Sequence, residues 1–110
     1  MRTLKASSEI DALFKSGRRG ATDLVLVLSV LTPASAPPGG RVLFVAGKKL
    51  GNATVRNRCK RVLREAVRRC GGPWPGADVA IVARGATASA KPEELDASLR
   101  RAVALAGVVK

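Results

Sequence analysis

Residues 47–70 read GKKLGNATVRNRCKRVLREAVRRC, and this stretch decides how the rest of the chain is interpreted. Nine of the chain's 20 Lys and Arg residues lie between Lys48 and Arg69, together with a single acid, Glu65. The stretch therefore carries +8 of the net charge of +12. Such a density of one sign predicts a strongly anionic partner.

The spacing of the apolar residues predicts a helix over residues 54–70. At about 100° per residue, one arc gathers Val55, Cys59, Val62, Leu63, Ala66 and Cys70, with Val67 at its margin. The opposite arc gathers Asn57, Lys60, Arg61, Arg64 and Arg68, with Arg56, Arg58 and Arg69 at the borders. Asn52 and Thr54 are both candidate N-caps, and Gly71 begins a Gly-Gly-Pro stop signal.

The cationic face contains like charges at i, i+4 spacing: Arg56, Lys60, Arg64 and Arg68. Such pairs destabilise an isolated helix. An ordinary solvated face usually mixes both signs, so a helix that tolerates this repulsion favours a polyanion that relieves it. We therefore predict nucleic-acid binding by this face.

Composition limits the remaining possibilities. A chain of 110 residues with 46% hydrophobic content can bury one core, so we expect a single RNA-binding domain over residues 1–110. A pI near 11.3 restricts the partner to RNA, DNA or an acidic membrane surface. No stretch approaches the ~20 apolar residues of a membrane span, and polar residues interrupt the N-terminal stretch. These features predict a cytoplasmic protein without a membrane partner.

The order of the predicted elements is helix, strand, strand, helix, strand, helix. The helices are expected over residues 7–17, 54–70 and from Pro92, and the strands over residues 23–32, 41–47 and 78–83. Residues 33–40 form a Pro/Gly/Ser/Ala loop, across which the first two strands are expected to pair antiparallel. The class is α+β, an α/β sandwich with a small mixed sheet. Trp74 could stack on a base, but we favour packing at the core edge.

The residues for protein catalysis are missing. The chain has no His, its acids are dispersed, and Glu65 is best explained by ion pairs with Arg61 or Arg69. Cys59 and Cys70 fall on the apolar arc and are expected to act as small apolar residues. No nucleophile–base pair or metal cluster is apparent, so we expect no catalytic residue, protein-held metal or small-molecule substrate. A partner would perform any catalysis.

Residues 48–65, KKLGNATVRNRCKRVLRE, resemble the signature segment of the protein subunit of bacterial ribonuclease P. The resemblance extends to SSEIDALFKSGRR at residues 7–19, RVLFVAGKK at 41–49 and PGADVAIVAR at 75–84. It implies a ribosomal-protein-like sandwich with a left-handed βαβ crossover around the basic helix. General chirality rules favour the opposite hand.

The resemblance also implies a function and its residues. The catalytic RNA would bind Lys49, Arg56, Asn57, Arg58, Lys60, Arg61, Arg64 and Arg68. The 5′ leader of precursor tRNA would bind in a cleft between the first helix and the sheet, at Phe14, Leu28, Lys48 and Arg84. The RNA would hold the Mg²⁺ ions and hydrolyse the phosphodiester. The chain would then be the accessory subunit of an endoribonuclease that releases mature tRNA 5′ ends.

Three other functions remain as alternatives. A non-enzymatic structural RNA-binding protein of the ribosome or another ribonucleoprotein would have the same composition and architecture. A DNA-binding module is weaker, because no helix-turn-helix partner precedes the basic helix. Membrane-surface binding is weaker still, because the apolar arc of the basic helix is needed for the core.

Overall fold

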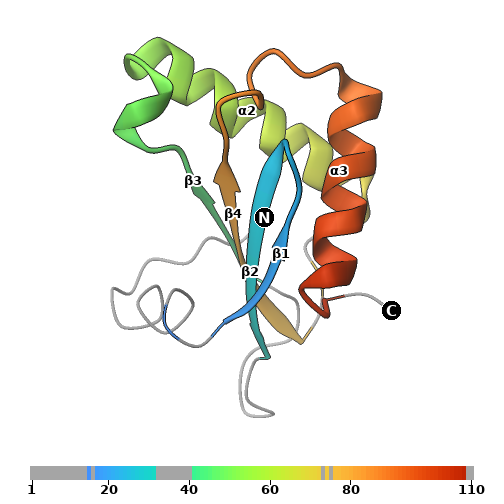
Figure 1. The fold of residues 1–110 in the computed structure, drawn as a ribbon. Coiled ribbons are helices and arrows are strands. Elements are labelled where there is room, and N and C mark those ends of the chain that lie inside the picture. Colours follow the sequence, from blue (N-terminus) through green and yellow to red (C-terminus); the bar gives the residue numbers. More distant parts are fainter. Residues whose placement is uncertain (1–14, 16, 32–40, 73, 75, 109–110) are drawn as a thin grey trace.

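The computed structural model describes residues 15, 17–31, 41–72, 74 and 76–108 and arranges them as a four-stranded sheet packed against helices (Figure 1). In chain order the elements are β1 (Arg18–Ala21), β2 (Val25–Leu31), β3 (Arg41–Val45), the 3₁₀ turn η1 (Lys48–Leu50), α2 (Ala53–Arg69), β4 (Ala77–Ala83) and α3 (Pro92–Leu105). This confirms the predicted α+β class and, within two residues at each described end, the two later helices and three strands. The helix expected over residues 7–17 lies almost wholly outside the described residues.

The strand order in the sheet is β1-β2-β4-β3, which corrects the expected pairing of the first two predicted strands. β2 and β3 are not neighbours, because β4 lies between them, antiparallel to β2 and parallel to β3. β4 is buried along almost its whole length, whereas β3 alternates between buried and half-buried positions. The almost continuously buried strand takes an inner position, and the strand with alternating burial takes an edge.

β1 is a strand that the sequence interpretation missed. Its residues, RRGA, pair antiparallel with β2, from Arg18 opposite Ser29 to Ala21 opposite Leu26. No element was expected over these residues, because glycine and neighbouring charges are not typical of a strand. A short, charged strand is nevertheless a common solution at the edge of a sheet, where it discourages pairing with another chain.

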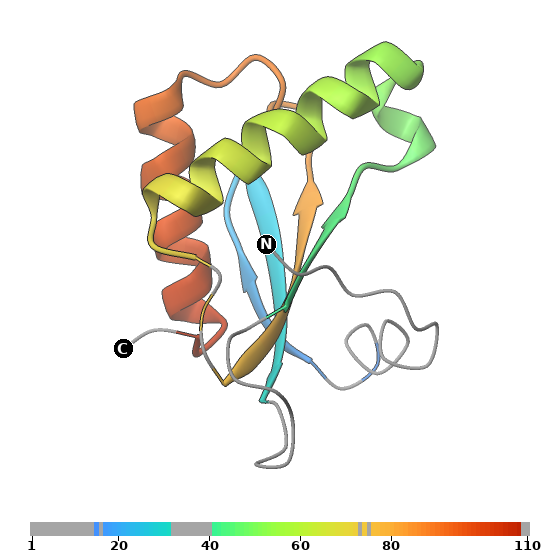
Figure 2. The ribbon, with the colours of Figure 1, turned by 180° about the vertical axis from the view of Figure 1, so that it is seen from behind.

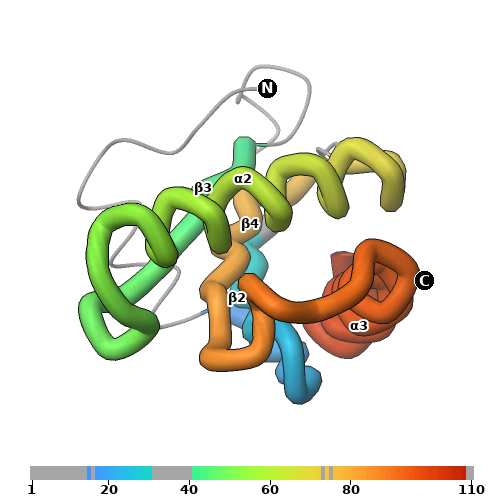
Figure 3. The backbone as a smooth tube through the Cα atoms, turned by 90° about the horizontal axis from the view of Figure 1, so that it is seen from above, coloured from blue at the N-terminus to red at the C-terminus, as the bar shows by residue number. Residues whose placement is uncertain are grey.

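Helices α2 and α3 cover the same face of the sheet, and the main core lies between them and the strands (Figure 2). The helices contribute Cys59, Leu63, Ala66, Val67, Leu95, Leu99, Ala102 and Val103, with Ala106 at the C-cap of α3. The strands contribute Val25, Val27, Val42, Phe44, Ala77, Val79, Ile81 and Ala83. From above, α2 runs across the sheet while α3 is seen nearly end-on, so the helix axes cross (Figure 3). The predicted apolar arc of α2 is confirmed, with Val55, Val62 and Cys70 partly buried at its margins.

The β3–α2–β4 crossover is left-handed. In Figure 2, α2 lies in front of the sheet and both parallel strands point upward, with β4 to the left of β3. A right-handed connection would place the second strand to the right. The hand expected from the family resemblance is therefore confirmed, against the general rule for parallel strands joined by a crossover.

Gly20 allows α3 to lie directly on β1. A Cβ atom at this position would stand 2.0 Å from the carbonyl oxygen of Ala102 and 2.8 Å from the amide nitrogen of Ala106. On the neighbouring strand, Ser29 Oγ donates a hydrogen bond of 2.7 Å to the Ala106 carbonyl. The end of α3 is thus held against β1 and β2 by close packing and one buried hydrogen bond.

Candidate nucleic-acid interface

Helix α2 begins at a turn with specific backbone requirements. Gly51, between η1 and α2, has a φ of 138°, a conformation that favours glycine. The next residue, Asn52, caps the helix, and its side-chain oxygen accepts a hydrogen bond of 3.1 Å from the Val55 amide. Of the two predicted caps, Asn52 is therefore the one used, and α2 has a defined start beside the end of β3.

The cations of α2 form one surface, which we call the basic face and define as Arg56, Asn57, Arg58, Lys60, Arg61, Arg64 and Arg68. Asn57, Arg58, Arg61, Arg64 and Arg68 are exposed, whereas Arg56 and Lys60 are half-buried. Lys49, on η1, is also exposed. The predicted RNA-binding residues on α2 thus share one accessible side of the helix, opposite its packed arc.

Two residues of the basic face reach toward β3. Arg56 Nε donates a hydrogen bond of 3.2 Å to the carbonyl of Ala46, just after that strand. The guanidinium carbon of Arg64 lies 5.5 Å from the centre of the Phe44 ring, a cation–π contact. These contacts reduce the side-chain freedom of both arginines. They also place both arginines on the side of α2 that is nearer to β3, the strand at the edge of the sheet.

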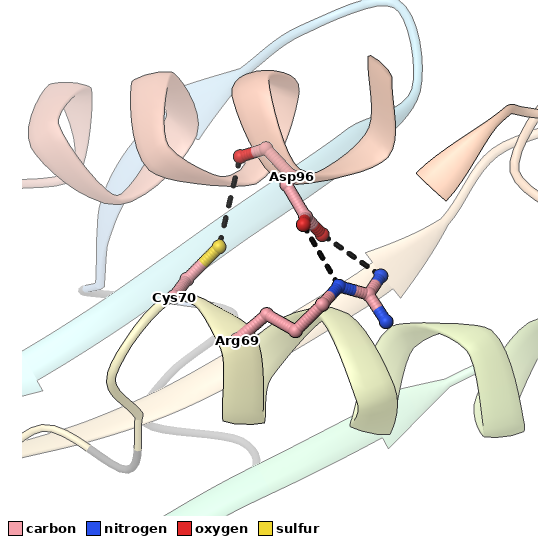
Figure 4. A network of polar contacts seen from close by, with 3 residues as sticks. All are labelled: Arg69, Cys70 and Asp96. Atoms are coloured by element: carbon pink, nitrogen blue, oxygen red, sulfur yellow. Dashed lines mark hydrogen bonds and ion pairs between the residues drawn. The ribbon is translucent and has the colours of Figure 1, made fainter. Parts of the chain in front are cut away.

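The opposite flank of α2 faces α3 and the loop before it. Arg58 Nε donates a hydrogen bond of 3.3 Å to the Ala88 carbonyl. Arg69 forms a bidentate ion pair with Asp96 of α3, through hydrogen bonds of 2.8 and 2.9 Å (Figure 4). The hydrogen bond to Asp96 raises the pKa of the Arg69 guanidinium. Within the described part of the chain, the expected Glu65 ion pairs are not formed, since Arg69 turns to Asp96 instead.

An open hollow of about 360 Å³ lies on the outer side of the first half of α2. It is lined by Thr54, Asn57, Arg58 and Arg61. Two guanidinium groups, an amide and a hydroxyl all interact well with phosphate oxygens. The hollow is therefore chemically suited to a nucleic-acid backbone, and three of its four residues belong to the basic face.

The predicted leader-binding residues divide between one face and one end of the sheet. Leu28 lies opposite Ala80 of β4, and these two buried residues form a small apolar cluster separate from the main core, on the face opposite the helices. Lys48 follows β3 and Arg84 follows β4, and these adjacent strands are parallel. Lys48 and Arg84 consequently lie at the same end of the sheet. Phe14 lies outside the described residues.

Arg84 combines a fixed backbone with an unsatisfied side chain. Its amide donates a hydrogen bond of 2.8 Å to Thr87 Oγ1. Its Nε is buried and has no hydrogen-bond acceptor within residues 15, 17–31, 41–72, 74 and 76–108. Sequence reasoning missed Thr87, since a lone threonine in a loop carries no pattern that distinguishes it.

The thiols and Trp74 have structural roles. Cys59 is buried, Cys70 is half-buried, and both are free thiols, as expected. Burial raises the pKa of each thiol. Cys70 Sγ also donates a weak hydrogen bond of 3.7 Å to the Asp96 carbonyl oxygen (Figure 4).

Trp74 is 6% exposed and belongs to the main core, which confirms the packing interpretation. Among the described residues, no three His, Cys, Asp or Glu side chains could together hold a metal ion.

Comparison with known proteins places this geometry in context. A family model described as Ribonuclease P matches residues 1–107. The chain is 36% identical to the ribonuclease P protein component of Brevibacillus brevis, over 97% of this chain and 84% of the relative. It is 35% identical to that of Symbiobacterium thermophilum, over 97% of this chain and 92% of the relative.

Two solved structures share the fold. The RNase P protein of Staphylococcus aureus superposes with a TM-score of 0.82 at 23% identity, covering 100% of this chain and 99% of that one. The RNase P protein of Thermotoga maritima gives a TM-score of 0.76, also at 23% identity and with the same coverage. At this level of identity the likeness supports the fold alone.

Proposed function

The chain belongs to the ribonuclease P protein family, as the protein component of the bacterial type, and from that premise we propose which surface meets each RNA. Membership places it in an endoribonuclease complex of protein and RNA that processes the 5′ leaders of tRNA precursors. The comparisons do not favour the alternative of a structural protein of the ribosome. The observation that carries the proposal is the largely exposed basic face of α2, six of whose seven residues lie within the segment of residues 48–65 that resembles the family signature.

We assign the catalytic RNA to the basic face together with Lys49. Arg58, Arg61, Arg64 and Arg68 are exposed on the side of α2 turned away from the core, so they can meet phosphates without any change in packing, whereas Arg56 and Lys60 are half-buried. Arg56, Arg58 and Arg64 are held by contacts to the protein, which lowers the conformational entropy lost on binding. Binding would also relieve the repulsion between like charges along the helix.

We assign the 5′ leader of precursor tRNA to Phe14, Leu28, Lys48 and Arg84. Two cations at one end of the sheet suit successive phosphates. Leu28 is buried beside Ala80 on the face away from α2, where it would form part of the apolar floor of the leader cleft. An aromatic residue such as Phe14 can stack on an unpaired base. The leader and the catalytic RNA would then bind different sides of the protein and meet at the end where β3 and β4 finish.

Catalysis is assigned to the RNA. We propose, from family membership, that the catalytic RNA holds the Mg²⁺ ions and hydrolyses the phosphodiester bond. The side chains of this chain would bind and orient the two RNAs and would reduce phosphate repulsion between them. The proposal includes no protein nucleophile, acid or base. A cytoplasmic location, expected from the sequence, stays a prediction.

A membrane-surface role receives no support from α2, because its apolar arc is packed in the core. No helix of the described residues is long and apolar enough to cross a membrane. The Arg and Lys side chains that could meet anionic lipid are the same ones assigned to the catalytic RNA. The two readings predict different partners for one surface, which makes them separable by experiment.

Reconstitution tests the proposed function. A bacterial ribonuclease P RNA would be assayed on precursor tRNA at low Mg²⁺, with and without the protein. We expect the protein to raise the rate of 5′ cleavage, because its cations offset phosphate repulsion that Mg²⁺ must otherwise screen. A basic protein of similar charge and unrelated fold is the control. A rate equal to that of the RNA alone, or equal to that with the control protein, would contradict the proposal.

A further inference from the structure

The loop of residues 84–91 joins β4 to α3 and begins with Arg84. Its centre is Thr87, which is 0% exposed. Thr87 Oγ1 donates a hydrogen bond of 2.6 Å to the carbonyl of Leu24, at the entry to β2. The same oxygen accepts a hydrogen bond of 2.8 Å from the Arg84 amide. One hydroxyl thus joins the first residue of the loop to a strand more than fifty positions earlier in the chain.

The backbone of Arg84 is held on both sides by this one residue. Besides the contact to the Arg84 amide, the Thr87 amide donates a hydrogen bond of 3.0 Å to the Arg84 carbonyl. Hydroxyl contacts to a nearby backbone commonly stabilise turns of this kind. The backbone from which the Arg84 side chain projects is consequently fixed relative to β2 and β4, although it lies beyond the last residue of the sheet.

A fixed Arg84 backbone could help the Arg84 side chain to bind a phosphate. The Nε of Arg84 is buried without an acceptor among the described residues, an unfavourable state for a charged donor. Arg84 as a whole is only half-buried, so the accessible part of its planar guanidinium can still meet a phosphate, even though Nε itself is covered. Fixing the backbone in advance limits the orientations from which Arg84 can reach that phosphate, which favours binding by pre-organisation.

The loop has a second anchor, which Thr87 does not share. The Ala88 carbonyl accepts the hydrogen bond from Arg58, and Ala88 and Ala90 pack against the main core. These contacts hold the middle of the loop against α2. They do not touch Arg84, so they leave the fixing of Arg84 to Thr87.

We propose that Thr87 is a positioning residue for Arg84 in recognition of the 5′ leader. Its hydroxyl would fix the Arg84 backbone so that the guanidinium meets a leader phosphate. The proposal rests on the proposed function, because it requires Arg84 to contact the leader. The simpler alternative is that Thr87 only satisfies the partly buried carbonyl of Leu24 and stabilises the fold.

The test compares leader recognition in the reconstituted holoenzyme. Affinities would be measured for precursor tRNA and for mature tRNA, and their ratio reports the leader contact. Thr87→Val keeps the side-chain shape and removes the hydroxyl, whereas Thr87→Ser keeps the hydroxyl. We expect Thr87→Val to lower the ratio by about fivefold, the equivalent of one net hydrogen bond, and Thr87→Ser to restore most of it.

Ser29→Ala is the matched control. Ser29 is also buried, at 6% exposure, and its hydroxyl also donates to a distant carbonyl, but on the helix-covered face and away from Arg84. We expect Ser29→Ala and Thr87→Val to lower the melting temperature by similar amounts. Only Thr87→Val should change the ratio of precursor to mature tRNA affinity.

A double-mutant cycle with Arg84→Ala completes the design. If Thr87 acts through Arg84, then Thr87→Val should have little further effect on the ratio once Arg84 is alanine. Additive effects, or an unchanged ratio in folded Thr87→Val, would overturn the proposal. If valine prevents folding, Thr87→Ala replaces it under the same criteria. The ratio of precursor to mature tRNA affinity is measured first in the wild-type holoenzyme. If the wild-type holoenzyme does not distinguish the two tRNAs, the result contradicts the proposed function.

Discussion

Arg61 and Arg69 lie about two turns apart on α2, but the structure gives their charges different surroundings. Arg69 donates two hydrogen bonds to Asp96, with side-chain exposures of 39% and 12% for the two partners. Arg61 is exposed and has no hydrogen bond or ion pair within the described part of the chain. We therefore expect the catalytic RNA to use the charge of Arg61 and not that of Arg69.

The salt dependence of RNA binding measures this difference. Loss of one phosphate contact reduces the slope of log affinity against log salt by about 0.7–0.9. Arg61→Ala should flatten the slope by this amount, whereas Arg69→Ala should change it by less than about 0.2, because Asp96 already neutralises that guanidinium. For Arg61→Ala, the loss of affinity relative to wild type at about 50 mM salt should shrink by about threefold at about 200 mM.

Fluorescence anisotropy with labelled catalytic RNA would give these slopes. The KCl concentration is varied at constant Mg²⁺, so that the RNA stays folded. Arg61→Lys keeps the charge and serves as the control, and circular dichroism establishes that each variant retains its helices. Equal slope changes for Arg61→Ala and Arg69→Ala would refute the reasoning. An unchanged slope for Arg61→Ala would remove that residue from the interface.

Three further expectations concern the fold. Gly20→Ala should destabilise the protein by about 3 kcal/mol or more in urea unfolding, because its Cβ would overlap the α3 backbone. Gly47→Ala, with no atom within 4 Å of its Cβ, should have a free energy of unfolding within about 0.5 kcal/mol of the wild-type value. Equal losses of stability in the two variants would contradict this account. Asn52→Ala should cost about 1 kcal/mol through loss of the cap, while Asn52→Asp should retain most of the stability. Burial raises the pKa of both thiols above the ordinary value of 9.0, so the folded state retains protons that the unfolded state loses, and the free energy of unfolding should fall as the pH rises above about 9. Cys59 and Cys70 should also react with a thiol reagent more slowly in the folded protein than in urea. Equal reaction rates would count against their burial.

Helix α2 could be predicted in detail because its own residues contain most of the information. The apolar arc, the cap and the stop signal all act within the helix, and the structure reproduces them. β4 could be found because the apolar run of residues 79–83 is typical of a strand covered on both faces. The exposed basic face follows directly, since residues outside the apolar arc of a packed helix must face solvent.

The strand pairing and several side-chain contacts could not be predicted in the same way. The order of β2, β4 and β3 depends on which strands are buried best in the inner positions of the sheet. The composition of one strand cannot decide this, because the result also depends on the other strands. β1 becomes a strand through its pairing with β2, against its own propensity. Arg69 pairs with Asp96 rather than Glu65 because α3 brings a carboxylate to the border of α2. Lys48 and Arg84 come together because their strands are parallel neighbours, which the predicted antiparallel hairpin did not include.

The position of β4 has a consequence for how the protein is made. β4 is one of the two inner strands of the sheet and also the last of the four in the chain, and its pairing of Val25 with Ala83 joins residues that lie 58 positions apart in the sequence. Such non-local pairing slows folding, and the inner edges of β2 and β3 remain unpaired until β4 leaves the ribosome. A nascent chain that ends before β4 already contains the basic face, but not the strand that completes the core beneath it. Premature contact with RNA would therefore engage a chain that has not yet folded.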